Sequence, residues 1–170
     1  MIKYFKISLP WSIPILALLL MSCSGDGGKI AGVLPDIVLP DIKGKPVRLM
    51  DLKGRVILLN FWATWCPPCQ REIPDFIQLQ KELGPKGLTI VGISLDQDKD
   101  LEQVAEYSLD MKINYLVLYA GQRQKEIAEK MGGFRGIPTS FLVDRSGRVV
   151  VKHLGLAPLG AWKEEIEKLL

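Results

Sequence analysis

Continuous apolar segments, rather than alternating ones, dominate the middle of the chain. Residues 56–62 (VILLNFW) and 88–95 (LTIVGISL) are apolar at nearly every position. Short apolar runs bounded by turn residues are typical of strands that are buried on both faces. Residues 67–83, between the two runs, have apolar side chains at helical spacing and are followed by Gly84 and Pro85. Because glycine and proline end helices, this order predicts a β-α-β unit.

The segments on either side of this unit predict further short strands and amphipathic helices. A small hairpin comes first, and an antiparallel pair and a helix come last. The expected elements are strands at 37–39 and 47–49, a helix at 99–111, a strand at 115–118, a helix at 122–131, strands at 139–143 and 148–153 joined by a turn at 144–147, and a helix at 159–170. This order predicts an α/β domain with a mixed sheet and helices on both faces.

The first 22 residues are expected to be an export signal rather than part of the fold. Lys3 and Lys6 precede residues 9–21, which are apolar except for Ser12 and are interrupted by two prolines. A basic start followed by a short apolar run is typical of a secretory signal, whereas a membrane-spanning helix needs about 20 apolar residues. We therefore expect residues 1–22 to be a signal peptide that is removed.

The end of this signal resembles the lipobox of bacterial lipoproteins. Leu20-Met21-Ser22-Cys23 places a small residue directly before a cysteine, although Met21 departs from the small residue that is most common at its position. The resemblance implies cleavage before Cys23 and attachment of acyl chains to that residue, which would anchor the protein to a membrane. An ordinary cleaved signal and an uncleaved anchor are the alternatives.

A polar, glycine-rich stretch (SGDGGKIAG, residues 24–32) follows the cysteine. Such a composition is typical of a flexible linker, so we expect residues 23–33 to be a tether and residues 34–170 to be the folded domain. The predicted location is extracytoplasmic, either periplasmic or at the outer cell face. Disulfides form and persist in that environment.

Composition and charge exclude several functions. Apolar residues make up 48% of the chain and charged residues 24%, which are values of an ordinary globular domain. The formal net charge is +3, from 22 basic and 19 acidic residues, and two of the basic residues are Lys3 and Lys6. The remaining chain is nearly neutral, so it has no basic excess with which to bind nucleic acid. Three cysteines are too few for a disulfide scaffold.

Candidate chemistry lies at Trp65-Cys66-Pro67-Pro68-Cys69, where the first buried strand passes into the helix. Cysteines three residues apart on a helical turn are neighbours, so their sulfurs can form a disulfide. Cys66 lies at the positive N-terminus of the helix, which favours the thiolate, whereas Cys69 lies one turn inside. We therefore expect Cys66 to exchange with an external sulfur and Cys69 to resolve the mixed disulfide.

The two prolines between the cysteines bear on the direction of that exchange. Pro67 and Pro68 are tolerated in a first helical turn, but they have no N–H to donate to the sulfur of Cys66. This predicts only moderate stabilisation of the thiolate, and hence a better reductant than oxidant. A zinc site is an alternative for such a pair, but zinc needs about four ligands and the chain offers only Cys23 and His153 in addition. We expect no metal and no other cofactor.

At this point the chain resembles a known family. Residues 61–69 (FWATWCPPC) resemble the active-site segment of the thioredoxin superfamily, and more closely that of its membrane-anchored TlpA/ResA branch. Pro74 matches the proline of the thioredoxin active-site helix, and residues 136–139 (GIPT) match the loop that carries a cis-proline. Residues 99–118 match the central insertion of the branch, as does the leading hairpin. The resemblance covers about residues 35–170 and implies a thioredoxin-like mixed β-sheet flanked by helices, with an N-terminal hairpin and a central αβ insertion.

The resemblance also implies how substrates bind. It predicts a cis bond between Ile137 and Pro138, which would place a backbone edge beside Cys66 for pairing with the extended backbone of a substrate. Trp65 would flank the sulfurs as a contact platform, and Trp62 is expected in the core. The residues expected to contact substrate are Trp65, Pro67, Pro68, Ile137 and Pro138.

Glu72 is the expected acid/base residue. Asn60 stands where thioredoxin itself has a buried aspartate that accepts a proton, and asparagine does not titrate. In the TlpA/ResA branch a glutamate three residues after the second cysteine has that role, and Glu72 occupies this position. One helical turn from Cys69, it could relay the proton of that thiol. A solvated helix glutamate is the alternative.

The implied function is thiol–disulfide exchange with exported proteins that contain cysteine pairs, and we favour reduction. Anchored members of this branch typically keep the cysteines of apocytochrome c or of other exported proteins reduced, with electrons from a membrane thiol donor. Three alternatives remain. A thioredoxin-like copper chaperone would carry its cysteines one residue further apart, a peroxidase-type redoxin would place the cysteine three residues after Thr64 rather than two, and a scaffold module would not need Cys66 at all.

Overall fold

The computed structural model describes residues 32–97 and 101–170. The predicted signal peptide 1–22 and the predicted lipid-attachment residue Cys23 lie outside these described residues. The elements, in chain order, are β1 (Gly32–Val33), β2 (Val38–Pro40), β3 (Pro46–Arg48), η1 (Leu49–Leu52), β4 (Val56–Trp62), α1 (Pro67–Leu83), η2 (Gly84–Lys86), β5 (Leu88–Ser94), α2 (Leu101–Asp110), β6 (Leu116–Tyr119), η3 (Gly121–Arg123), α3 (Gln124–Lys130), β7 (Thr139–Val143), β8 (Arg148–Leu154) and α4 (Leu159–Glu167).

Six of the strands form one mixed sheet in the order β1-β8-β7-β4-β5-β6, and β2 pairs with β3 in a separate hairpin. Strand β5 runs parallel to β4 and to β6, whereas β7 is antiparallel to β4 and to β8. Every residue of β4 is buried, and all of β5 is buried except the half-buried Thr89. The predicted β-α-β unit, mixed sheet, leading hairpin and antiparallel β7–β8 pair are therefore confirmed.

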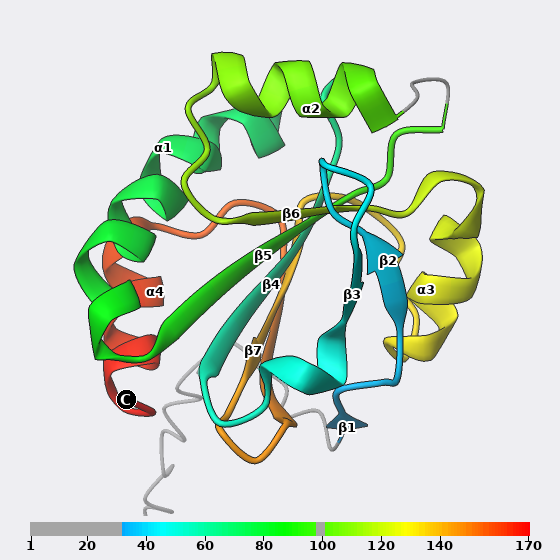
Figure 1. The fold of residues 1–170 in the computed structure, drawn as a ribbon. Coiled ribbons are helices and arrows are strands. Elements are labelled where there is room, and N and C mark those ends of the chain that lie inside the picture. Colours follow the sequence, from blue (N-terminus) through cyan, green and yellow to red (C-terminus); the bar gives the residue numbers. More distant parts are fainter. Residues whose placement is uncertain (1–31, 98–100) are drawn as a thin grey trace, which may run out of the picture.

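Alternate residues of β4 supply the cores on the two faces of the sheet. Ile57, Leu59 and Phe61 point toward the β2–β3 hairpin and α3, where they pack with residues such as Leu39 and Ile127. On the other face, the side chains between them pack against α1 and α4 through Val56, Leu58, Phe76, Leu79, Leu83, Trp162 and Ile166. Figure 1 shows α1 and α4 on one side of the sheet and α3 with the hairpin on the other. The strand needs apolar side chains in both directions because helices or a hairpin cover both faces.

The central insertion extends the sheet by a strand. Helix α2 crosses from β5 to the edge strand β6, which pairs with β5 in parallel, and a single bridge between Asp41 and Leu118 joins the hairpin turn to β6. The sequence predicts a helix at 99–111; its first two residues lie outside the described part, and α2 is seen from Leu101 to Asp110. Among the described residues, none of the helices has both the length and the apolar character needed to cross a membrane.

Strand β1 was not expected from the sequence. Gly32 and Val33, the last two residues of the stretch predicted as a tether, pair antiparallel with Val149 and Arg148 of β8. The ordered sheet therefore begins two residues before position 34. Because glycine has low strand propensity, the sequence does not indicate a strand at these residues. The pairing depends on the edge of β8, whose backbone groups the two residues bond.

The direction of the strands determines where the chemistry lies. Strands β4 and β5 end at the same edge of the sheet because they are parallel, and β7 begins there because it is antiparallel to β4. The loop before α1, the loop after β5 and the loop before β7 thus converge at one place. The predicted cysteine pair and the predicted cis-proline lie on two of these three loops.

Candidate active site

Cys66 and Cys69 are joined by a disulfide at the N-terminus of α1. Their Cα atoms are 5.3 Å apart, within the range that a disulfide requires. Cys66 is the N-cap residue of the helix, and Cys69 lies within its first turn. Cys69 is completely buried, whereas Cys66 keeps 3% of its surface exposed. Of the two cysteines, Cys66 is therefore the less buried, as expected for the one that exchanges with an external sulfur.

One backbone N–H reaches the sulfur of Cys66. The amide of Cys69 donates to Cys66 Sγ across 3.3 Å. The two preceding residues, Pro67 and Pro68, occupy the positions from which other first-turn amides would donate, and proline has no N–H. The first regular helical bond follows at once, from the Gln70 amide to the Cys66 carbonyl. Among the described residues, this geometry gives the sulfur a single backbone donor. The moderate thiolate stabilisation expected from the sequence stays a prediction.

The loop before β7 lies against the reactive sulfur. The Ile137–Pro138 peptide bond is cis, as predicted. Cys66 Sγ lies 3.9 Å from the carbonyl oxygen of Ile137. Two hydrogen bonds fix the loop: the Gly155 amide donates to the Pro138 carbonyl, and the Thr139 hydroxyl donates to the Gly136 carbonyl. The structure therefore brings together the two segments that the sequence identified separately.

The two neighbouring tryptophans have different surroundings. Trp62 is buried in a core cluster that also contains both cysteines, as predicted. Trp65 is 64% exposed, directly before the disulfide. An exposed indole is an unusual surface group, and its position beside the reactive sulfur suits a contact platform. His153 lies on β8, where its Nε2 is 3.1 Å from the carbonyl oxygen of Leu156 and its ring packs edge-on against Trp162, so its role is structural.

Glu72 is buried on the inner side of α1, one turn after Cys69. Only 2% of its surface is exposed, which excludes the alternative of a solvated helix glutamate. Asn60 Nδ2 donates to Glu72 Oε1 across 2.6 Å, and the other carboxyl oxygen has no hydrogen-bond partner. Burial raises the pKa of Glu72 to about 8, the Asn60 hydrogen bond partly opposes this, and nearby Asp75 adds to the rise. The carboxyl group can thus gain or lose a proton near neutral pH.

A second buried carboxylate, that of Asp96, was not identified from the sequence. It lies directly after β5 and accepts hydrogen bonds from the Thr64 amide, the Thr64 hydroxyl and the Ser94 hydroxyl, the last two at 2.6 and 2.7 Å. Gln70 Nε2 donates to the Thr64 carbonyl across 2.6 Å. Hydrogen bonds to Asp96 and to Gln70 thus fix the position of Thr64, two residues before Cys66. Its hydroxyl is bonded to Asp96 and does not form the peroxidase-like arrangement with Cys66 that the sequence faintly suggested.

Together these features define a class of protein: a thioredoxin-fold thiol–disulfide oxidoreductase. A cysteine pair at a helix N-terminus faces a cis-proline loop at the end of a mixed sheet, and a buried carboxyl with a raised pKa lies one helical turn after the second cysteine. Among residues 32–97 and 101–170 there is no group of three or more His, Cys, Asp or Glu that could hold a metal ion.

Comparison with known proteins identifies the family. The AhpC/TSA family matches residues 30–152, and the chain belongs to it. A relative named thiol-disulfide oxidoreductase ResA, from Bacillus cereus, is 35% identical over 121 residues, which cover 71% of this chain and 67% of the relative.

Solved structures agree with this family. A crystal structure described as a putative thiol:disulfide interchange protein DsbE, from Chlorobium tepidum, has a TM-score of 0.74 at 30% identity, covering 84% of this chain and 97% of that one. An exposed lipoprotein thioredoxin from Streptococcus pneumoniae has a TM-score of 0.68 at 26% identity, covering 79% of this chain and all of that one.

Replacing Glu72 by glutamine should change how the stability of the disulfide form depends on pH. Between the ordinary carboxyl range and about pH 8, the folded protein holds a proton on Glu72 that the unfolded chain has lost. The free energy of unfolding should therefore fall as pH rises through this range and level off above it. The fall is at most about 4 to 5 kcal/mol, since a separation of one pH unit between the folded and unfolded pKa corresponds to about 1.4 kcal/mol.

Urea denaturation of the oxidised protein between about pH 5 and pH 9 measures this dependence. The Glu72→Gln variant should lack the decline. A Glu106→Gln variant, changed at an exposed position of α2, is the matched control and should keep it. If the free energy of unfolding has the same dependence on pH in the wild type and in both variants, Glu72 ionises in the folded state as it does in the unfolded chain, and the prediction is wrong.

Proposed function

We propose that this oxidoreductase acts outside the cytoplasm, anchored to a membrane through Cys23, and reduces disulfides in exported proteins such as apocytochrome c. One observation carries the proposal: Cys66, which keeps 3% of its surface exposed, is bonded to the completely buried Cys69, and Glu72, whose pKa burial raises to about 8, lies one helical turn after Cys69. This asymmetry supports a role for the Cys66 sulfur in exchange with the client and for the Cys69 sulfur in resolution. A membrane thiol donor would return the protein to the dithiol form.

The first chemical step joins the protein to its client. In the dithiol form, the Cys66 thiolate attacks one sulfur of a client disulfide. A bond forms between Cys66 and the client, the client disulfide breaks, and its second sulfur leaves as a thiolate that takes a proton from water. The Ile137 backbone beside Cys66 and the exposed ring of Trp65 are the groups placed to hold the client during this step.

The second step releases the client. The Cys69 thiol must lose its proton before its sulfur can attack Cys66, and the buried position excludes water as the acceptor. Glu72, one helical turn away, accepts that proton as a carboxylate and returns it when the donor reduces the pair again. The new Cys66–Cys69 bond forms as the mixed disulfide breaks. The client leaves reduced by two electrons, and the protein is oxidised by two.

Reduction rather than oxidation is favoured by the environment of Cys66. An oxidant of this fold requires a strongly stabilised thiolate, because that stabilises its reduced form. Here Pro67 and Pro68 remove two possible donors, and the Cys69 amide remains. No lysine, arginine or histidine lies between the cysteines. The dithiol form is therefore not strongly favoured over the disulfide form, so the dithiol readily reduces a client disulfide.

The proposed location rests on the N-terminal sequence and on similar proteins. The basic and then apolar residues 1–22 suit an export signal, and Cys23 follows a sequence that resembles a lipobox. The similar structure from Streptococcus pneumoniae is described as an exposed lipoprotein. A lipid at Cys23 would hold the domain within reach of clients that emerge across the same membrane.

A Cys69→Ala variant should trap clients. It can complete the first step but not the second, so mixed disulfides on Cys66 should accumulate. Expressed in full length, the variant should give adducts on non-reducing gels that disappear with dithiothreitol and contain proteins with cysteine pairs. The matched control Cys66→Ala, which keeps the other cysteine, should give none. Equal adducts from both variants would contradict the assignment of Cys66 as the exchanging sulfur.

A Glu72→Gln variant should slow resolution rather than attack. Glutamine keeps the hydrogen bond from Asn60 but accepts no proton, so release of the client should slow by about 100-fold near pH 7. In the wild type this rate should rise with pH toward about 8, as the carboxylate forms, and in the variant this rise should be lost. Stopped-flow measurement of the first and second thiol released from a peptide disulfide separates the two steps. Unchanged resolution would remove Glu72 from the mechanism.

A Cys23→Ala variant should release the protein from the membrane. Without the thiol at the lipobox, no acyl chain can be attached, and removal of the signal by this route should also fail. Fractionation of cells fed a radioactive fatty acid should show label in the wild type and none in the variant. Cys66→Ala, which alters a different cysteine, should be labelled normally. Label that persists in Cys23→Ala would contradict the lipid anchor and leave the redox assignment unaffected.

A further inference from the structure

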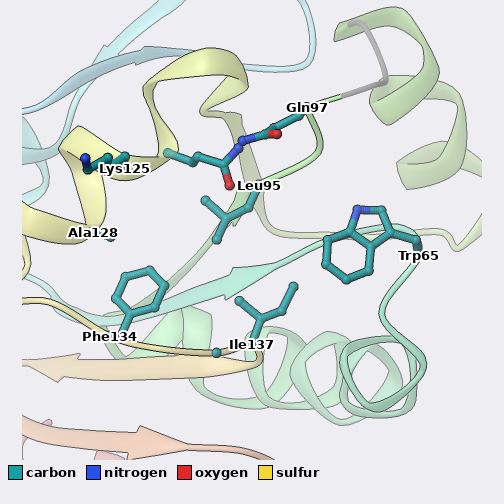
Figure 2. A pocket seen from close by; sticks show the side chains of 9 residues that line it. Trp65, Leu95, Gln97, Lys125, Ala128, Phe134 and Ile137 are labelled. Carbon is teal, nitrogen blue, oxygen red and sulfur yellow. The ribbon is translucent and has the colours of Figure 1, made fainter.

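A hollow of about 410 Å³ opens beside the cysteine pair. Its apolar lining comes from Trp65, Leu95, Ala128, Phe134 and Ile137, and its polar lining from Gln97, Gln124 and Lys125. Figure 2 shows the side chains of Leu95, Phe134 and Ile137 around the same space, with Trp65 toward one end and Lys125 toward the other. Its volume falls within the range of sites that bind small ligands.

The hollow is continuous with the reaction site. Trp65 directly precedes Cys66, and the carbonyl of Ile137 lies 3.9 Å from Cys66 Sγ, so both residues border the sulfur and the hollow. An extended peptide advances about 3.3 Å per residue. A client whose cysteine is bonded to Cys66 therefore brings residues one to three positions from that cysteine within reach of the hollow.

Two polar groups of α3 in the hollow lack partners among the described residues. Gln124 Nε2 is buried and has no hydrogen-bond partner, although leaving a buried donor unpaired is unfavourable. Lys125 is exposed and takes part in no ion pair, whereas Glu126 beside it is shared by Arg123 and Lys130. The lining thus offers a positive charge that no described acidic residue pairs with.

We infer that this hollow selects clients by the residues next to their reacting cysteine: it takes an apolar side chain onto Leu95, Phe134 and Ile137, and Lys125 binds an acidic residue that neighbours this side chain. The inference rests on the proposed function, because it names the peptide sequence that the same site prefers. Apolar burial supplies affinity, and the single lysine distinguishes acidic from basic clients.

Short synthetic peptides test this preference. Each carries one cysteine as a neutral thiopyridyl mixed disulfide, with leucine or alanine one, two or three positions from it, followed by glutamate or lysine. Release of thiopyridone gives the second-order rate constant with the dithiol form of the purified full-length chain. Every rate is divided by that of the same protein with 2,2′-dithiodipyridine, a neutral small disulfide, which corrects for differences in Cys66 itself.

At the best of the three positions, leucine should react at least about tenfold faster than alanine, since burial of its side chain is worth about 1.5 to 3 kcal/mol. Glutamate should exceed lysine by about threefold to fivefold, the size of an exposed ion pair. Lys125→Glu should invert the charge preference, and Ala128→Leu, which adds methylenes to the hollow, should reduce the preference for leucine. Lys81→Glu, changed at an exposed position near the far end of α1, is the control and should keep both preferences.

The outcomes separate this inference from the proposed function. Equal rates for all peptides, or a charge preference that Lys125→Glu leaves unchanged, would overturn the hollow as a selective site while the protein still reduces disulfides. Failure to release thiopyridone from any peptide, with normal reaction of 2,2′-dithiodipyridine, would instead contradict the reduction of peptide disulfides. Loss of the leucine preference in Ala128→Leu together with charge inversion in Lys125→Glu would establish both parts.

Discussion

The structure depends on the way the chain leaves the buried strand β4 and enters α1. At that junction Cys66 caps the helix, its sulfur accepts the Cys69 amide, and the two sulfurs are bonded. Proline at the next two positions costs no hydrogen bond within the helix, because first-turn amides have no helical partner. The same prolines withhold donors from the sulfur. One local feature therefore positions the pair and leaves the Cys69 amide as the backbone donor to the Cys66 sulfur among the described residues.

Two carboxyl groups buried at this end of the sheet have different surroundings. Glu72 keeps one carboxyl oxygen without a partner, and burial raises its pKa to about 8. An apolar residue would pack there at lower cost, but it could not exchange a proton with a thiol that water does not reach. Asp96 is different, because three hydrogen bonds satisfy it and hold Thr64 in place. Burial thus raises the pKa of Glu72, whereas the hydrogen bonds of Asp96 hold the loop before α1.

Each of the three loops at this edge of the sheet contributes a different group to the site. The loop before α1 carries the sulfurs, the loop before β7 presents the Ile137 carbonyl to them, and the loop after β5 supplies Asp96. A parallel pair beside an antiparallel strand is the arrangement that brings all three together. Helix α3, which covers the adjacent face of the sheet, then extends this edge into a hollow with Gln124 and Lys125.

The amino-acid sequence by itself determined the features that depend on near neighbours. The β4-α1-β5 unit, the cysteine pair at the helix start and the place of Glu72 one turn later all follow from periodicity and short spacing, and resemblance to a family added the cis bond before Pro138. The tertiary structure alone decided the pairing of Gly32–Val33 with β8, the contact of Asp96 with Thr64 across 32 residues, and the hollow between α3 and Ile137. These contacts join segments distant in the chain, and no local pattern specifies them because their energies arise only once the sheet has brought its strand ends together.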